Sequence, residues 1–232
     1  MPPSLKGSWI SPKFVCLLIA AFGLPAPSFA LLPEAGLFVR PSYWAVHYGG
    51  SSFSSNMQFS KPDASWARGG SLAIGVDLGA GKSHELSIEL GRLTWDFTQP
   101  YFGSGTAAST VLGASGHGHL APLLVNYRFS ILSPWNGLRI YGAISAGTTK
   151  VQGDVLEKLS GVMNSWSGDD WKKTYGFGAG VSWDATSHIS LEVGYRLLRI
   201  GGSNWPSHFG LSSLNFSDIE ASAFTAAVSF KL

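Results

Sequence analysis

The chain has 232 residues, of which only 13% are charged, together with 29 glycines and 9 tryptophans. Low charge combined with many aromatic residues excludes an intrinsically disordered chain, which has the opposite composition. The sequence contains no run of about 18 apolar residues, so it does not predict a membrane-spanning helix.

Residues 1–30 have the layout of a secretory signal peptide. Lys6 and Lys13 provide a positive flank, residues 14–24 form a short apolar core, and small residues lead to a cleavage site after Ala30. The apolar core is too short to span a membrane as a helix. We therefore expect export and cleavage, with an uncleaved anchor as the alternative.

Cleavage would leave residues 31–232 as one domain. Its 14 basic residues, which remain after Lys6 and Lys13 are removed, equal its 14 acidic residues, so the charge balance gives no argument for nucleic acid as a partner. The single cysteine, Cys16, would leave with the signal, and we expect no disulfide and no cysteine metal site.

Eight stretches of the mature chain alternate apolar residues with small or polar ones, which is the period of a β-strand. In chain order they cover residues 36–48, 71–79, 84–91, 120–129, 137–147, 175–184, 189–197 and 222–232. Pro41 in the first stretch removes a ladder donor and favours a strand edge or a bulge.

The connections between these stretches alternate in length. Those after the second, fourth and sixth stretches are short, whereas four others are long, at residues 49–70, 98–116, 148–173 and 201–217. An even number of strands with short turns at one rim and long loops at the other is typical of outer-membrane barrels. The sequence predicts an all-β fold, an eight-stranded antiparallel transmembrane barrel with short periplasmic turns and long extracellular loops.

A secreted β-sandwich is the alternative, because its strands alternate as well. A sandwich turns a charged face to water, but here the second face is mostly Gly, Ala and Ser, which suits the narrow interior of an eight-stranded barrel. Trp44, Trp95, Trp135 and Trp183 fall near predicted strand ends, where we expect aromatic girdles at the membrane interfaces.

Residues 36–232 resemble the eight-stranded outer-membrane β-barrel family of OmpA/OmpX and opacity-porin type. The stretches that carry this resemblance are LAPLLVNYRF, GLRIYGAISAG, YGFGAGVSWD, SLEVGYRLL and the final SAFTAAVSFKL. The resemblance implies an outer-membrane location and insertion by the barrel assembly machinery. That machinery reads alternate apolar residues of the last strand, here Phe224, Val228, Phe230 and Leu232, and Leu232 stands where the family usually ends in Phe.

Several charged residues share the phase of the small-residue face, so we expect their side chains in the lumen: Arg40, Asp77, Glu85, Glu89, Arg128, Arg139, Glu192 and Arg196. A charge facing lipid at mid-membrane would cost about 2–4 kcal/mol. Because the two signs nearly match, we expect a salt-bridge network that plugs the lumen, with a gate as the alternative. Arg92 breaks the pattern and predicts either an outer-rim position or a bulge at Gly91.

Three motifs suggest chemistry but lack its context. LGAGKS, residues 78–83, resembles a phosphate-binding loop, but its glycine spacing is wrong and a strand pattern follows it. YGFGAG lacks the spacing of a dinucleotide fingerprint. His117 and His119 lie two residues apart without an evident third metal ligand. We predict no catalytic residues, no cofactor and no metal.

The long loops are therefore the predicted contact surface, with Trp166, Trp171 and Trp205 as anchors. The predicted function is a structural or surface-interaction role in the outer membrane. Its expected partners are membrane lipids, the barrel assembly machinery and an extracellular ligand that the sequence does not identify. Two alternatives stay open: a narrow channel for small solutes through the charged lumen, and an enzyme that modifies lipid A.

Overall fold

A computed structural model of the chain describes residues 36–49, 53–54, 66–78, 83–101, 112–132, 137–159, 162–206, 213–216 and 218–232. The predicted signal peptide, residues 1–30, lies outside the described residues, as do parts of the predicted turns and loops. Within the described ranges, no helix is long and apolar enough to cross a membrane.

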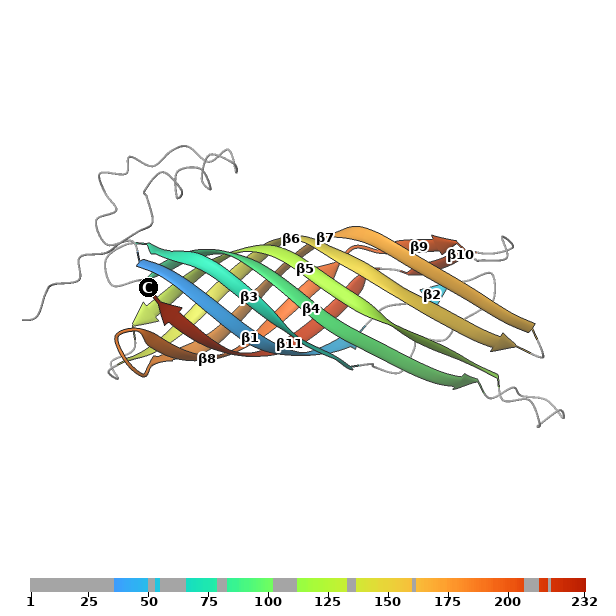
Figure 1. Cartoon of the computed structure of the whole chain (residues 1–232), viewed down its shortest axis with the longest axis horizontal. Helices are drawn as coiled ribbons and strands as arrows, with labels where there is room; N and C mark the ends of the chain where they lie inside the picture. The colour runs from blue at the N-terminus through green and yellow to red at the C-terminus, as the bar shows by residue number, and fades with distance from the viewer. Residues whose placement is uncertain are drawn as a thin grey trace, which may run out of the picture. The chain divides into compact units, whose positions relative to one another are not determined.

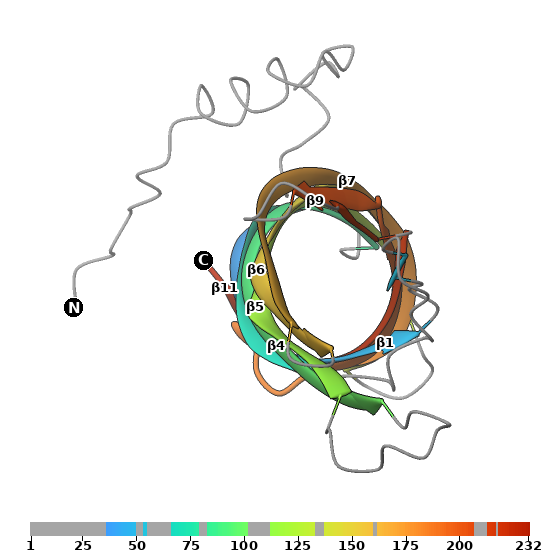
Figure 2. The same ribbon diagram turned by 90° about the vertical axis from the view of Figure 1, so that its right-hand side faces the viewer.

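Eight antiparallel strands close into a barrel, as predicted, in the order β1-β11-β8-β7-β6-β5-β4-β3 (Figures 1 and 2). Their bounds are β1 Gly36–Gly49, β3 Trp66–Leu78, β4 His84–Tyr101, β5 Leu112–Leu132, β6 Leu138–Leu159, β7 Val162–Asp184, β8 Ile189–Ile200 and β11 Ile219–Lys231. The first strand pairs with the last, with Phe38 opposite Lys231. Closure leaves no free edge within the membrane, where an unpaired backbone group would cost several kcal/mol.

The short connections lie at the end of the barrel that also holds Gly36 and the C-terminus. Gly36 pairs with Asp77 just before the turn into β4, and residues 185–188 join β7 to β8. Gly137, which precedes β6, has a φ of 80°, a left-handed conformation that favours glycine. By the convention of outer-membrane barrels this end is periplasmic and the other is extracellular.

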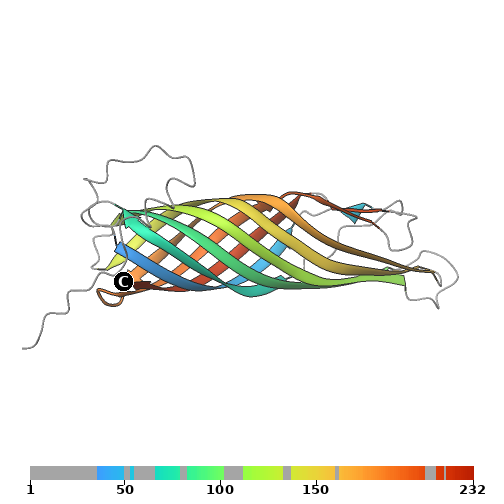
Figure 3. The ribbon, with the colours of Figure 1, turned by 45° about the horizontal axis from the view of Figure 1, so that its top comes forward.

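Side chains alternate strictly between the lumen and the outer wall. On β8, Leu191, Val193 and Tyr195 point outward and are at least 40% exposed, whereas Ser190 and Glu192 point inward and are buried. The same outward phase on the other strands gives an apolar band around the barrel that suits contact with lipid. The strands that form this band tilt across the barrel (Figure 3).

One of the predicted long loops is largely strand, and strands extend into a second. β6 and β7 stay paired from Leu138↔Trp183 to Leu159↔Val162, so residues 148–159 and 162–173 are paired strands, and β4 and β5 extend into the predicted loop 98–116 as far as residues 101 and 112. The prediction was wrong here because it looked for apolar residues facing outward. Beyond the apolar band the outer face meets water, so polar residues take the outward phase and apolar ones, such as Val151 and Val155, the inward phase.

A second, three-stranded sheet lies within the other two predicted loops. It has the order β2-β10-β9 and consists of β2 (Phe53–Ser54), β9 (Ser203–Pro206) and β10 (Ser213–Phe216). The Ser203 hydroxyl donates a hydrogen bond to Asp170 of β7. This bond tethers the small sheet to the extracellular end of the barrel (Figure 1).

The tryptophan girdle was predicted only partly correctly. Trp183 faces outward and is 50% exposed, but Trp44 and Trp95 point into the lumen, with exposures of 0% and 9%. Their phase explains the error, because Trp44 lies two residues from Ser42 and four from Arg40, both on the inward face. Trp135 lies outside the described residues.

Arg92 faces outward without a bulge. On the β3 side, Gly70 pairs with Arg92 and Ser71 with Gly91, so the one-to-one register continues through Gly91. On the β5 side, Leu90↔Leu123 and Leu93↔Leu120 share one register. The predicted bulge at Gly91 is therefore absent. The alternative holds, because Arg92 lies on the outer wall at the extracellular margin of the apolar band.

Candidate functional site

The lumen holds an ion-pair quartet of Arg40, Arg128, Glu85 and Glu192. Arg40 contacts Glu85, and its Nε lies 3.0 Å from Glu192 Oε1; Arg128 Nη1 donates to Glu192 Oε2 at 2.6 Å, and its Nε lies 3.6 Å from Glu85. All four side chains are less than 10% exposed. Each charge therefore faces two partners of opposite sign, which is the arrangement that offsets the desolvation of buried ions.

A second cluster surrounds Glu89, which is only 1% exposed. Its carboxylate accepts hydrogen bonds from Arg196 at 2.7 Å, from Asn126 at 2.8 Å and from Ser71. The Arg196 guanidinium also lies over the Trp44 ring, 4.9 Å from its centroid. This cluster connects β4 to β8 across the interior of the barrel.

A third cluster lies near the periplasmic rim and includes two charges that the sequence analysis did not name. Asp184 accepts hydrogen bonds from Arg139 at 2.5 Å, from Lys231 at 2.8 Å and from Ser190 at 2.5 Å. The inward phase of Ser182 and Ser229 was a signal that could have found both Asp184 and Lys231. Asp77 is buried on β3, opposite Glu85 of β4.

The eight predicted lumen charges all point inward, and Asp184 and Lys231 join them. Together these ten residues carry five positive and five negative charges. The positive and negative charges in the periplasmic part of the lumen are thus equal in number. Balanced, mutually contacting charges fill space and hold the strands together, and these ten residues carry no net charge that would favour ions of one sign.

Above the charges the lumen becomes apolar. We call this region the apolar plug; its largest fully buried side chains are Trp44, Trp166, Trp205, Leu124 and Leu214. A void of about 10 Å³ remains beside Trp44, Leu93 and Leu120. That volume is at the lower limit for a single water molecule. The side chains of the apolar plug therefore occupy part of the interior that the ribbon in Figure 2 leaves undrawn.

The three predicted loop tryptophans do not lie in loops. Trp166 and Trp171 belong to β7 and Trp205 to β9, and only Trp171 is exposed, at 58%. Trp166 and Trp205 are 1% exposed and face inward. Trp205 packs against the backbone of Gly168, because a Cβ at Gly168 would lie 2.0 Å from its indole nitrogen. These two residues seal the barrel instead of reaching outward.

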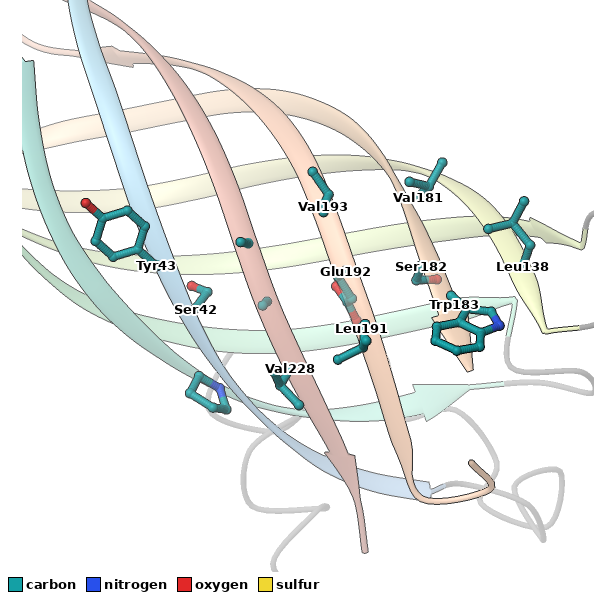
Figure 4. A pocket seen from close by; sticks show the side chains of 13 residues that line it. Ser42, Tyr43, Leu138, Val181, Ser182, Trp183, Leu191, Glu192, Val193 and Val228 are labelled. Atoms are coloured by element: carbon teal, nitrogen blue, oxygen red, sulfur yellow. The ribbon is translucent and has the colours of Figure 1, made fainter. Parts of the chain in front are cut away.

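The outer wall carries an apolar hollow of about 610 Å³ over β1, β7, β8 and β11 (Figure 4). Tyr43, Trp183 and Leu191 are among its lining residues, and Ala226 and Ala227 leave space between the larger side chains. Most of the lining lies within the lipid-facing band, and the inward-facing residues Ser42, Ser182 and Glu192 contribute at its floor. Its composition suits contact with hydrocarbon chains.

Described histidines have polar side-chain partners at both ends of the barrel. His117 Nε2 lies 3.8 Å from Asp154 at the extracellular end, whereas at the periplasmic end His188 hydrogen-bonds Ser187 at 2.8 Å and His84 Nδ1 hydrogen-bonds the Tyr127 hydroxyl at 2.7 Å. These contacts lie at opposite ends of the barrel. Among the residues that the structure describes, no group of three His, Cys, Asp or Glu side chains could hold a metal ion.

Residues 14–231 match the family described as outer membrane protein beta-barrel domain. A search of curated proteins found no match. A major outer membrane protein from Thermus thermophilus is similar in structure, with 12% identity, 86% of this chain and 100% of that chain covered, and a TM-score of 0.54. At this identity, the similarity shows the fold alone.

Two further solved structures are neighbours with lower scores. Neisserial surface protein A has 14% identity, with 86% of this chain and 99% of that chain covered and a TM-score of 0.46. Ail of Yersinia pestis has 11% identity, with 86% and 99% covered and a TM-score of 0.47. The family match, which spans nearly the whole chain, agrees with the closed eight-stranded barrel, and the chain belongs to the outer membrane protein β-barrel family and is located in the outer membrane.

Proposed function

We propose that the protein is a non-conducting outer-membrane barrel that presents an extracellular sheet to partners at the cell surface. We define the extracellular sheet as residues 94–101 of β4, 112–119 of β5, 150–159 of β6 and 162–173 of β7. The observation that carries the proposal is that these four strands continue beyond the apolar band, while apolar side chains and ion pairs pack the lumen beneath them. Binding residues commonly lie on segments that a rigid scaffold positions.

The outward face of the extracellular sheet supports this role. It carries charged and polar side chains, with Lys150 paired to Asp169 at 3.1 Å and Gln152 hydrogen-bonded to Asp169 at 3.0 Å. The exposed Trp171 adds a large apolar surface beside Lys150, its partner in the register. Aromatic residues among polar neighbours are enriched at protein interfaces.

One edge of the extracellular sheet also favours binding. β8 begins to pair with β7 only at Thr174↔Ile200, so β7 extends beyond this partner from Val162 to Lys173. β9 covers part of this edge through Ser203. Strand edges offer backbone hydrogen-bonding groups to an extended segment of a partner.

A solute channel is less well supported than surface binding. A conducted ion would have to pass the apolar plug, whose described void is about 10 Å³, and then the balanced charges below it. Barrels of eight strands are just wide enough for side chains to fill. An enzyme that modifies lipid A finds no support in the described histidine contacts, because that of His117 lies at the extracellular end and those of His84 and His188 lie at the periplasmic end.

The test compares cells that display the wild type, cells that display a variant in which an Asn-Gly turn replaces residues 157–164, and control cells that display neither. The turn closes the hairpin above Leu156↔Ser165 and leaves Trp166 and Val155 in place. We expect adhesion to surfaces coated with matrix proteins, or cell–cell aggregation, to be lost with the shortened hairpin. Steady single-channel conductance of the wild type, with equal adhesion by both barrels, would overturn the proposal.

The remaining predictions concern export and assembly. We propose that residues 1–30 direct export and that β11 is read by the barrel assembly machinery. Of the four residues predicted as this signal, Phe224, Val228 and Phe230 share the outward phase of β11, and Leu232 directly follows the strand, so a lipid-embedded machinery can contact them.

A further inference from the structure

Two arginines lie side by side on the outer wall, at the extracellular margin of the apolar band. Arg68 on β3 and Arg92 on β4 both point outward and are exposed. In the register Gly70 faces Arg92 and Arg68 faces Thr94, so the two arginines are diagonal neighbours on adjacent strands. Diagonal pairs on one sheet face lie within reach of long side chains.

Hydrocarbon-facing residues begin directly below them. Leu90, two residues from Arg92, is 61% exposed, and Leu72, four residues from Arg68, is 46% exposed. The arginines therefore mark the level where the apolar band gives way to the extracellular sheet. A long arginine side chain at this level can extend its guanidinium into the headgroup layer.

Neither guanidinium has an ion-pair partner among the described residues. Other outward basic residues at this end are matched, Lys150 with Asp169 at 3.1 Å and Arg199 with Asp218 at 2.8 Å. The register neighbours of the arginines are small or uncharged: Gly70, Thr94, Ala45 on β1 and the outward-facing Ala121 next along on β5. These positions leave space for a ligand. The carboxylate of Asp96 on β4 lies diagonal to Arg68 on the extracellular side, and among the described residues it forms no ion pair with either arginine.

We propose that Arg68 and Arg92 form a clamp for the phosphate group of an outer-leaflet lipid. Guanidinium groups donate paired hydrogen bonds that match the geometry of phosphate oxygens. The acyl chains of such a lipid would lie along Leu90 and Leu72, where burial of apolar surface adds to the affinity. This inference depends on the outer-membrane location, and it is independent of the surface-binding function proposed above.

The test uses the full barrel in nanodiscs of phosphatidylcholine and follows binding of added lipid A by native mass spectrometry. The variant is Arg68→Gln with Arg92→Gln, and the matched control is Arg199→Gln, which removes an outward arginine that already has an acidic partner. We expect the double variant to lose at least tenfold in lipid A affinity and the control to bind like the wild type. Both should keep the heat-dependent gel shift of a folded barrel.

Two further binding experiments identify which part of lipid A the two arginines recognise. The first uses lipid A from which the phosphates have been removed. Its affinity for the wild type should be no higher than the affinity of phosphorylated lipid A for the double variant. Inorganic phosphate at millimolar concentration should not displace bound lipid A if the acyl chains contribute. Equal lipid A binding by wild type and double variant, equal binding of the dephosphorylated lipid, or full displacement by inorganic phosphate would each overturn the proposal.

Discussion

Glu89 and Arg196, which are 107 positions apart in the chain, form a 2.7 Å ion pair inside the barrel. Glu89 is held on three sides by Arg196, Asn126 and Ser71, whereas the Arg196 side chain keeps 18% exposure. The two partners therefore differ in what their removal leaves behind. Loss of the arginine leaves a fully buried carboxylate, but loss of the carboxylate leaves a partly solvated guanidinium.

We expect Arg196→Met to lower the free energy of unfolding by about 3–5 kcal/mol, the usual effect of leaving a buried charge without its partner. Glu89→Gln should cost less, and the double variant should recover part of the loss, because neither charge then remains unpaired. Urea unfolding in lipid vesicles measures all three. Lys150→Met, which breaks an exposed pair, is the control and should cost no more than about 1 kcal/mol; equal losses for all four variants would contradict this account.

A matched pair of glycines on β6 tests how tightly the strands are packed. A Cβ at Gly147 would lie 2.1 Å from the backbone oxygen of Leu123, whereas a Cβ at Gly142 would meet nothing within 4 Å. Gly147→Ala must shift a neighbouring strand and should cost about 1–3 kcal/mol. Gly142→Ala should be neutral or stabilise by up to about 1 kcal/mol. Urea unfolding of both variants measures these changes in the free energy of unfolding. A similar loss of stability in both would show that contact with the neighbouring strand is not the cause.

The fold was predictable because one physical rule, alternation between lipid and lumen, acts along every strand in the membrane. That rule placed Arg40, Glu89 and Glu192 on the inward face, where the structure has them. It failed for residues 148–173, because water replaces lipid outside the membrane and the polarity of the two faces reverses. Strand pairing itself does not depend on which solvent the outer face meets.

The contacts within the lumen were less predictable than the phase. Alternation indicates that Arg40 and Arg128 face inward, but the partner of each depends on strand tilt and register, which bring Glu85 and Glu192 together from β4 and β8. The buried positions of Trp166 and Trp205 were missed for a different reason. Their surroundings are rich in Gly and Ser, a composition typical of loops, and only the pairing of β7 and the packing of β9 place them inside.

The proposed closure of the lumen predicts how conductance should respond to substitution. The apolar plug and the ion-pair quartet lie one above the other, so each alone should block ions. We expect no conductance from the wild type, from Trp44→Ala or from Arg128→Ala, and measurable conductance only when both substitutions are combined. Planar-bilayer recordings check this, with the gel shift as a control for folding; channel activity in Trp44→Ala alone would show that the charges do not close the lumen.

Assembly gives a prediction for β11. Phe230 points outward at 43% exposure, and its neighbour Ser229 points inward at 2%. If the outward phase is read during insertion, Phe230→Ser should lower the yield of barrel in the outer membrane several-fold in cells, while detergent refolding of the purified chain proceeds. Ala226→Ser, an outward polar substitution at a position outside the predicted signal, is the control. Equal membrane yields for both variants would contradict the role assigned to Phe230.

The tether between β7 and β9 predicts a pH dependence at the extracellular end. The Ser203 hydroxyl, followed by Lys172, lowers the pKa of Asp170 below its ordinary value of 3.8. A lowered carboxyl pKa means that the tether contributes its full stability above the unfolded pKa and loses it as the pH falls through the folded pKa. Acidification from pH 4 toward 2 should therefore release β9 and expose Trp205, which is 1% exposed at the start.

Trp205 reports this release, because its fluorescence can be isolated by subtracting the spectrum of Trp205→Phe. Ser203→Ala removes the hydroxyl donor, so the pKa of Asp170 should return toward its ordinary value and the midpoint of the fluorescence change should move to higher pH. Asp154→Asn, which alters an extracellular contact with His117 that does not involve β9, should leave that midpoint in place. A midpoint that is the same with and without the Ser203 hydroxyl would mean that another group controls the docking of β9.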